Sequence, residues 1–227
     1  MRYPVLVFAL AVAGVVAPAG AQTPTPEASP RQRAHSNPPE SGLGTLPPGV
    51  GIPVGEEAPD ARLRSADGSE VSLHDLTRGG AALLVFYRGG WCPYCNFQIR
   101  QLTETYPELR RRGVTPVAIS VDRVQEAART QATYEIPFPV LSDPDLAAHR
   151  AYRVLHQADA AEVARLGAAG IDLERSSGRA HHVIATPALF VIDREGVVRW
   201  AHADPDYKVR PSPAQILAAI DGLAPRP

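Results

Sequence analysis

The chain has only two cysteines and one methionine among its 227 residues, and Lys208 is its only lysine. Two cysteines exclude a small fold stapled by several disulfides, and also a structural zinc site built mainly from thiolates. The 23 basic and 24 acidic residues give a formal net charge of -1, which indicates neither nucleic-acid binding nor an acidic tail. Because 44% of the residues are hydrophobic, the chain is not disordered throughout.

The N-terminal segment 1–21 has the pattern of a secretory signal peptide. Arg2 gives a positive start, residues 5–16 form an uncharged apolar run, and Ala19-Gly20-Ala21 is a small-x-small cleavage site. A membrane anchor is the alternative, but the run is shorter than the roughly 20 residues that span a bilayer. We expect cleavage after Ala21 and a periplasmic or secreted protein without membrane attachment.

The next segment, residues 22–53, is rich in proline and poor in apolar side chains. Too few apolar groups are available here to offset the entropy lost on ordering the chain. This composition predicts a flexible, partly extended tether. Residues 54–227 are then left to form one domain around a single core.

Strand and helix patterns alternate along this domain. The expected strands are 61–64, 70–73, 82–87, 114–120, 138–141, 188–192 and 197–201. The expected helices are 93–112, 123–134, 145–152 and one that begins at Ser212-Pro213. This order predicts an α/β fold with a mixed central sheet and helices on both faces. Residues 156–180 fit no core element and are predicted to be an insertion with a helix at 159–166.

The chemistry is concentrated in Trp91-Cys92-Pro93-Tyr94-Cys95, between a buried strand and an amphipathic helix. Pro93 suits the first helical position, so Cys92 is predicted to be the N-cap, with Cys95 one turn inside. Free N–H groups and the helix dipole favour a thiolate at Cys92. We therefore expect a reversible disulfide in which an exposed Cys92 attacks first and Cys95 resolves.

Plainer roles for these residues are also possible. A structural disulfide closing so short a ring would contribute only roughly 2 kcal/mol, and structural zinc would need two further ligands. Arg88 lies close to the cysteines in sequence and could help to hold a thiolate. His181-His182 are either loop histidines or ligands of copper together with both cysteines.

The segment Phe86-Tyr87-Arg88-Gly89-Gly90-Trp91-Cys92-Pro93-Tyr94-Cys95 resembles the active site of the thioredoxin-fold superfamily. More narrowly, it resembles the peroxiredoxin-like branch of the alkyl hydroperoxide reductase and thiol-specific antioxidant family. The similarity runs from Val54 to Leu223 and includes residues 55–60, 189–196 and 206–210. It implies a thioredoxin-like fold and antioxidant chemistry without a cofactor or metal. A small thiol or a thioredoxin-like reductase would supply electrons, and a peroxide or protein disulfide would accept them.

The resemblance also assigns roles to single residues. Trp91, Pro93 and Tyr94 would support the cysteines. Thr186-Pro187 resembles the cis-proline segment that faces the cysteine pair, where the backbone of Thr186 would bind an extended thiol substrate. Arg210 resembles a family arginine near the C-terminal helix, and the alternative for it is a surface arginine.

The match to peroxiredoxins departs from their pattern at two positions. Cys95 falls at their peroxide-attacking position and Cys92 at the place of a threonine, while Pro187 stands where an arginine is usual. Peroxide reduction would then begin at Cys95, and Cys92 would close the disulfide.

We therefore expect an exported, peroxiredoxin-like thiol oxidoreductase. The alternatives are a protein disulfide reductase without peroxidase activity and a non-enzymatic copper chaperone of thioredoxin fold. Such chaperones have three residues between their cysteines, whereas this chain has two.

Overall fold

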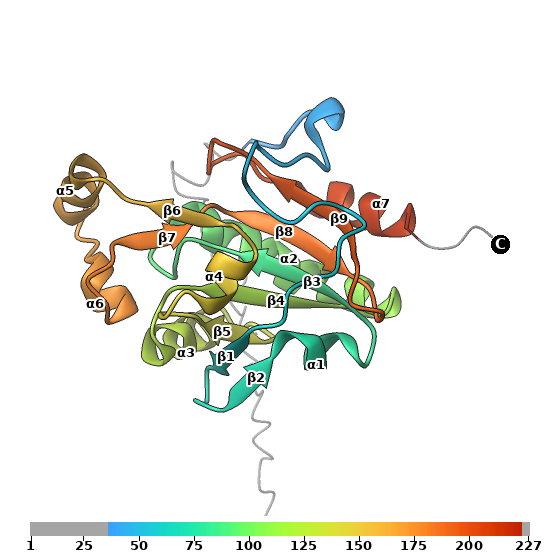
Figure 1. Ribbon diagram of the computed structural model, residues 1–227, viewed down its shortest axis with the longest axis horizontal. Helices are drawn as coiled ribbons and strands as arrows, with labels where there is room; N and C mark the ends of the chain where they lie inside the picture. Colours follow the sequence, from blue (N-terminus) through green and yellow to red (C-terminus); the bar gives the residue numbers. More distant parts are fainter. Residues whose placement is uncertain (1–35, 224–227) are drawn as a thin grey trace, which may run out of the picture.

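A seven-stranded mixed sheet forms the centre of the protein, whose computed structural model describes residues 36–223 (Figure 1). The strand order is β2-β1-β5-β4-β3-β8-β9. Their bounds are β1 (Arg62–Ser65), β2 (Glu70–Ser72), β3 (Ala81–Phe86), β4 (Val114–Ser120), β5 (Val140–Ser142), β8 (Ala188–Ile192) and β9 (Val198–Ala203). Strands β3, β4 and β5 are parallel, and β1 and β8 flank them in antiparallel pairing. The predicted signal peptide lies outside the described residues.

Helices cover both faces of the sheet, as the sequence predicts. Successive side chains of β3 point to opposite faces, so Leu83 and Val85 join one core cluster while Leu84 and Phe86 join the other. The first cluster packs against α2 (Pro93–Arg111), α3 (Val124–Thr133) and α7 (Pro213–Asp221). The second packs against α1 (Leu73–Thr77) and α4 (Ala147–Ala151).

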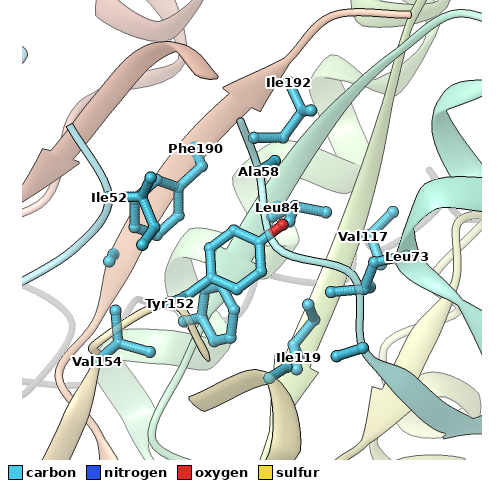
Figure 2. Close-up of a cluster of buried hydrophobic side chains, with 14 of the residues drawn as sticks. Ile52, Ala58, Leu73, Leu84, Val117, Ile119, Tyr152, Val154, Phe190 and Ile192 are labelled. Carbon is cyan, nitrogen blue, oxygen red and sulfur yellow. The ribbon is translucent and has the colours of Figure 1, made fainter. Parts of the chain in front are cut away.

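Aromatic rings fill the centre of the second cluster. Figure 2 shows Tyr152 among Leu84, Ile119 and Phe190. The Tyr152 ring centroid lies 5.3 Å from that of Phe190 and 5.2 Å from that of Phe86. These contacts fix the end of β3, from which the chain runs to the cysteine pair.

Residues 36–53 pack on the domain, so the predicted flexible tether is wrong over this part. Ile52 is only 2% exposed and belongs to the core, with Val50 packed beside it. The backbone carbonyl of Thr45 accepts a hydrogen bond from the N–H of Ala203 in β9 (2.9 Å). The segment also contains a short 3-10 helix, η2 (Glu40–Gly42). Apolar side chains are few here, but they lie where the core accepts them; residues 22–35 lie outside the described part.

The predicted insertion is an ordered subdomain beside the sheet, at the left of Figure 1. It comprises β6 (Leu155–Gln157), α5 (Ala160–Ala168), α6 (Leu173–Ser177) and β7 (Val183–Ala185), and β6 pairs with β7. Helix α5 confirms the helix expected at 159–166. The other three elements have five residues or fewer, too short to show a periodic pattern. None of the helices within residues 36–223 is long and apolar enough to cross a bilayer.

Candidate active site

The cysteine pair lies at the junction of β3 and α2. Pro93 is the first residue of α2 and Cys92 is its N-cap, both as predicted. The turn before them depends on a close approach between Gly90 and helix α3, because a Cβ atom at residue 90 would collide with Oγ1 of Thr130. Both cysteines therefore lie in the tightly packed first turn of α2, directly after the turn that follows β3.

Both thiols are free, and their sulfur atoms lie 2.7 Å apart. Cys92 is 1% exposed and Cys95 is fully buried, so the predicted exposure of Cys92 is wrong. Trp91 and Tyr94, both only half-buried, pack on the same cluster as the two cysteines and help to keep water from them. A substrate that reaches the two sulfurs therefore has to be small, or has to displace the side chains that cover them.

The electrostatics of the site distinguish the two sulfurs. Burial opposes ionisation of Cys95, but hydrogen bonding from Cys92, the charge of Arg210 and the backbone N–H of Arg88 together lower the pKa of Cys95 to about 6. Burial and the adjacent Cys95 sulfur instead raise the pKa of Cys92 well above its usual range. The sequence predicted the low-pKa thiolate at Cys92. This was wrong because the helix start does not offset the loss of water and the presence of a neighbouring thiolate.

Arg210 supplies a buried positive charge next to Cys95. It is 3% exposed, and its Nη2 lies 3.8 Å from the Cys95 sulfur. Within residues 36–223 no carboxylate forms an ion pair with it. A buried guanidinium without an anion is costly, so the Cys95 thiolate is its counter-ion. This burial excludes the alternative of a surface arginine.

Arg88 ties the insertion to the cysteine pair. Its Nη2 forms a 2.6 Å ion pair with Glu162 of α5, and both side chains are largely buried. The guanidinium lies over the rings of Tyr207 (4.2 Å) and Trp91 (5.4 Å), while its backbone N–H faces the Cys95 sulfur. Glu162 and Tyr207 were not predicted, because no local pattern reveals a partner 74 residues away.

Thr186-Pro187 differs from its prediction, since the described residues contain no cis peptide bond. These two residues carry the chain through a trans bond, the usual isomer, from β7 of the small sheet to β8 of the main sheet. The backbone N–H of Thr186 donates to the carbonyl of Val154 (2.8 Å), so it is not free for a substrate. Pro187 does lie beside Arg210, in the wall of a small cavity.

Asp122, which lies shortly after β4, is a further buried group of the site. Its Oδ2 accepts hydrogen bonds from the Gly90 backbone N–H (2.8 Å) and the Ser120 hydroxyl (3.1 Å). Its Oδ1 is buried and has no hydrogen-bond partner among the residues that the structure describes, and the residue lines a cleft of about 280 Å³ beside Trp91. Burial raises the pKa of Asp122 to about 7, and the nearby Cys95 adds to the rise. A strand-end aspartate is visible in sequence, but its burial is not.

Asp122→Asn is expected to make the protein more stable than wild type at neutral pH and above. Because the folded-state pKa of about 7 exceeds the ordinary 3.8, folding favours the protonated form, and stability falls as pH rises between these values. The asparagine amide would keep an oxygen for the Gly90 N–H without the charge. At pH 8 the Tm of the variant should exceed that of wild type by roughly 2–8 °C, and the two should converge near pH 4. Thermal unfolding followed by circular dichroism measures this. An equal difference at both pH values would contradict it, and Asp145→Asn, at an exposed carboxylate, is the control.

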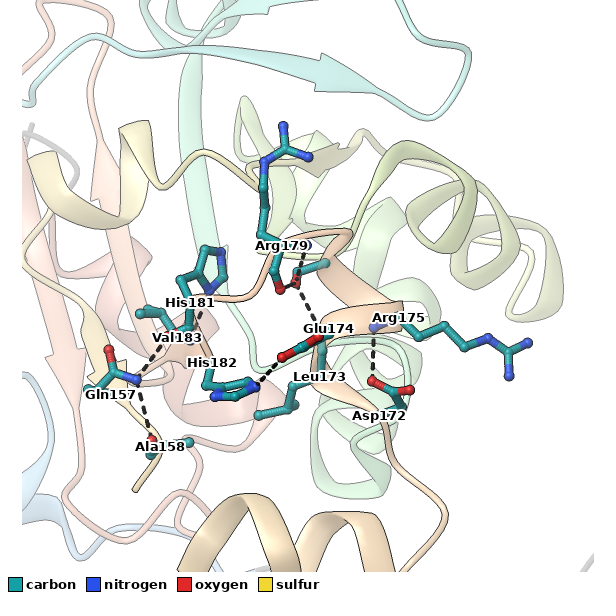
Figure 3. Close-up of polar contacts among 11 residues, drawn as sticks. Gln157, Ala158, Asp172, Leu173, Glu174, Arg175, Arg179, His181, His182 and Val183 are labelled. Carbon is teal, nitrogen blue, oxygen red and sulfur yellow. Dashed lines mark hydrogen bonds and ion pairs between the residues drawn. The ribbon is translucent and has the colours of Figure 1, made fainter. Parts of the chain in front are cut away.

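The two neighbouring histidines have separate partners, and Figure 3 shows His182 beside Glu174 of the insertion. His181 Nε2 donates to the carbonyl of Pro144 (3.0 Å), and His182 Nε2 contacts Glu174 Oε1 (2.9 Å). In the part of the chain that the structure describes, no group of three or more His, Cys, Asp or Glu side chains is placed to hold a metal ion. Both histidines are engaged in contacts that order residues 155–183.

Comparison with known proteins bears on this geometry. The AhpC/TSA family matches residues 54–201. The putative peroxiredoxin bcp of Coxiella burnetii is 29% identical over 173 residues, which are 75% of this chain and 100% of that protein. The thiol-disulfide oxidoreductase ResA of Bacillus cereus is 31% identical over 91 residues, which are 40% of this chain and 51% of ResA. The crystal structure of peroxidoxin BcpB from Mycobacterium tuberculosis aligns with a TM-score of 0.60 at 19% identity, covering 78% of this chain and 99% of BcpB. At that identity the structural likeness is one of fold.

Proposed function

Because the chain belongs to the AhpC/TSA family and is a thiol oxidoreductase of thioredoxin-like fold, we propose that it reduces hydroperoxides. Cys95 is the attacking thiolate and Cys92 the resolving thiol. The observation that carries this proposal is the Cys95 sulfur, whose pKa is lowered to about 6 beside the buried Arg210. A thiolate is the form of cysteine that attacks peroxide.

The two cysteines together supply both electrons that reduce one peroxide. The Cys95 thiolate attacks one peroxide oxygen, the O–O bond breaks, and the other oxygen leaves as an alcohol or water after taking a proton. Cys95 is then a sulfenic acid. Cys92 attacks its sulfur, water leaves, and a Cys92–Cys95 disulfide forms. Two thiol equivalents from an external donor, a small thiol or a thioredoxin-like reductase, restore the dithiol.

The surroundings of Cys95 support attack on a small substrate. Its sulfur is fully buried, which suits a small peroxide better than a protein disulfide. The guanidinium of Arg210 lies where it can stabilise negative charge that develops on the leaving oxygen.

Exchange with protein disulfides is the second candidate function. It is favoured by the 2.7 Å separation of the two sulfurs across one helical turn and by the similarity to ResA over 91 residues. In this case Cys95 or Cys92 would form a mixed disulfide with the partner protein, and the other cysteine would release it.

One pair of measurements separates the two functions. The reduced protein is mixed with hydrogen peroxide in a stopped-flow instrument and followed by tryptophan fluorescence, since Trp91 adjoins the cysteines. In parallel, its reduction of insulin is measured with dithiothreitol as donor. We expect rapid oxidation by peroxide and little insulin reduction. Rapid insulin reduction with no reaction toward peroxide would overturn the proposal in favour of disulfide exchange.

We further propose that the protein is exported and cleaved after Ala21, which the signal-peptide pattern of residues 1–21 supports. The proposal places the dithiol in a compartment where disulfides persist. Intact mass measurement of the protein purified from a Gram-negative host should give a chain that begins at Gln22. A full-length chain in the cytoplasmic fraction would contradict export.

A further inference from the structure

A small cavity next to Arg210 contains several polar groups that the reaction above does not use. It measures about 10 Å³ and lies between α2, β8, β9 and the loop after β9. Its polar walls include Gln98, one turn after Cys95 on α2, His202 on β9, and Arg210. Each of these three residues is only 3% exposed.

Four nitrogen atoms of these residues have no hydrogen-bond partner within residues 36–223. They are Nε2 of Gln98, both ring nitrogens of His202 and Nε of Arg210. A buried polar group left unpaired costs about 1–3 kcal/mol, so several at one place indicate a missing partner. The cavity volume is close to the roughly 10–15 Å³ that one water molecule needs, and a buried water typically forms two to four hydrogen bonds.

The chemistry of the walls matches that of a water molecule. The Gln98 amide nitrogen and the Arg210 Nε–H can only donate, which uses the two lone pairs of the water. A neutral His202 offers one acceptor nitrogen, to which the water can donate. His202 is kept neutral because burial lowers its pKa, and Arg210 lowers it further, against the opposing charge of Asp204. Asp204 also lines the cavity, and the Trp200 ring is stacked on that of His202 at 6.0 Å between centroids.

We propose that this cavity holds one buried water and that His202 and Gln98, through that water, fix the direction in which Arg210 faces Cys95. Both are positioning residues, since neither is placed to touch a reacting atom. The inference rests on the proposed function, because it explains how the reactive thiolate of that function is held. Without the water, the Nε side of Arg210 would have no partner to resist rotation away from the sulfur.

The test is the titration of each cysteine, measured by NMR on protein labelled with ¹³C at the cysteine Cβ. In His202→Leu the Cys95 pKa should rise by about one unit, which means about tenfold less thiolate at pH 5. Gln98→Met should shift it in the same direction. The double variant should shift it by less than the sum of the two, since both act through one water. His202→Gln, which keeps a polar end, should restore much of the wild-type titration.

Leu189→Val is the matched control. Leu189 lines the same cavity and lies opposite His202 in the β8–β9 register, but it has no hydrogen-bonding side chain. Its loss of a methylene should lower stability and leave the Cys95 titration unchanged. A crystal structure of the reduced wild type should show one water bonded to His202, Gln98 and Arg210.

The possible outcomes separate this inference from the proposed function. If His202→Leu and Gln98→Met titrate like wild type while peroxide is still reduced, the positioning role is wrong and the proposed function stands. If both variants raise the Cys95 pKa but wild type does not reduce peroxide, the positioning role stands and the proposed function is wrong. A shift in Leu189→Val as large as in His202→Leu would show that packing alone is responsible, and would overturn the role of the water.

Discussion

Cys95→Ser is expected to lose its reaction with hydrogen peroxide, by a factor on the order of a thousand or more, since it removes the attacking thiolate. Cys92→Ser should still react, because the Cys95 sulfur remains beside Arg210. Without the resolving thiol, however, its product should stop at the sulfenic acid. We therefore expect Cys95→Ser to be inactive toward peroxide and Cys92→Ser to gain a single oxygen atom.

Stopped-flow kinetics give the rates, and mass spectrometry after trapping with dimedone locates the oxygen. Intact wild type should yield a disulfide and no trapped adduct at completion. An adduct on Cys92 in Cys95→Ser, formed as fast as wild type is oxidised, would assign attack to Cys92. That was the order expected for disulfide exchange from the helix-start position alone, and the mixed disulfides formed by each variant test it separately.

Arg210→Met should reduce the peroxide rate at pH 7 by roughly tenfold, because an opposite charge at this distance shifts a pKa by about 1–3 units, and a rise of about two units leaves about a tenth of Cys95 as thiolate at pH 7. The sign follows from the direction of the shift. The hydrogen bond from Cys92 and the charge of Arg210 contribute to lowering the Cys95 pKa to about 6, so wild-type Cys95 is mostly thiolate at pH 7. Without that charge Cys95 is mostly thiol at pH 7, and the rate should recover partly as pH rises toward 9.

A pH–rate profile between pH 5 and 9 measures this effect. Arg100→Met is the control, since Arg100 lies on the same helix as Cys95 but is exposed and pairs only with Glu104 one turn away. It should leave the profile unchanged. A uniform loss across the whole range in Arg210→Met would mean that the guanidinium acts on the leaving oxygen and not on the ionisation of Cys95.

The sequence was sufficient for those parts of the fold that depend on local pattern. Strand β3 is a continuous apolar run, helix α2 has an apolar stripe, and Pro93 marks the helix start, so both were predicted within a residue or two. The short elements β6, β7 and α6 are held by partners elsewhere in the chain, and no local pattern reveals them.

The candidate site was also predictable only in part. One short sequence motif identifies both cysteines, but which of them ionises depends on burial and on Arg210, which lies 115 residues after Cys95 in the chain. Asp122, Glu162 and His202 matter because they are buried next to charged groups, and burial of a polar residue cannot be read from its neighbours in sequence. The isomer of the Thr186-Pro187 bond likewise cannot be read from the two residues themselves, and it is trans in the structure.

Arg210 is buried with the Cys95 thiolate as its counter-ion, and this affects the reduction potential of the cysteine pair. In the dithiol form the charge of Arg210, which is 3% exposed, is balanced by the Cys95 thiolate, and formation of the disulfide removes that anion. The protein thus stabilises its reduced form selectively, which makes the reduction potential less negative by about 30 mV for each 1.4 kcal/mol of the difference. The disulfide is therefore a comparatively strong oxidant, and even a weakly reducing thiol pool would be sufficient to regenerate the dithiol.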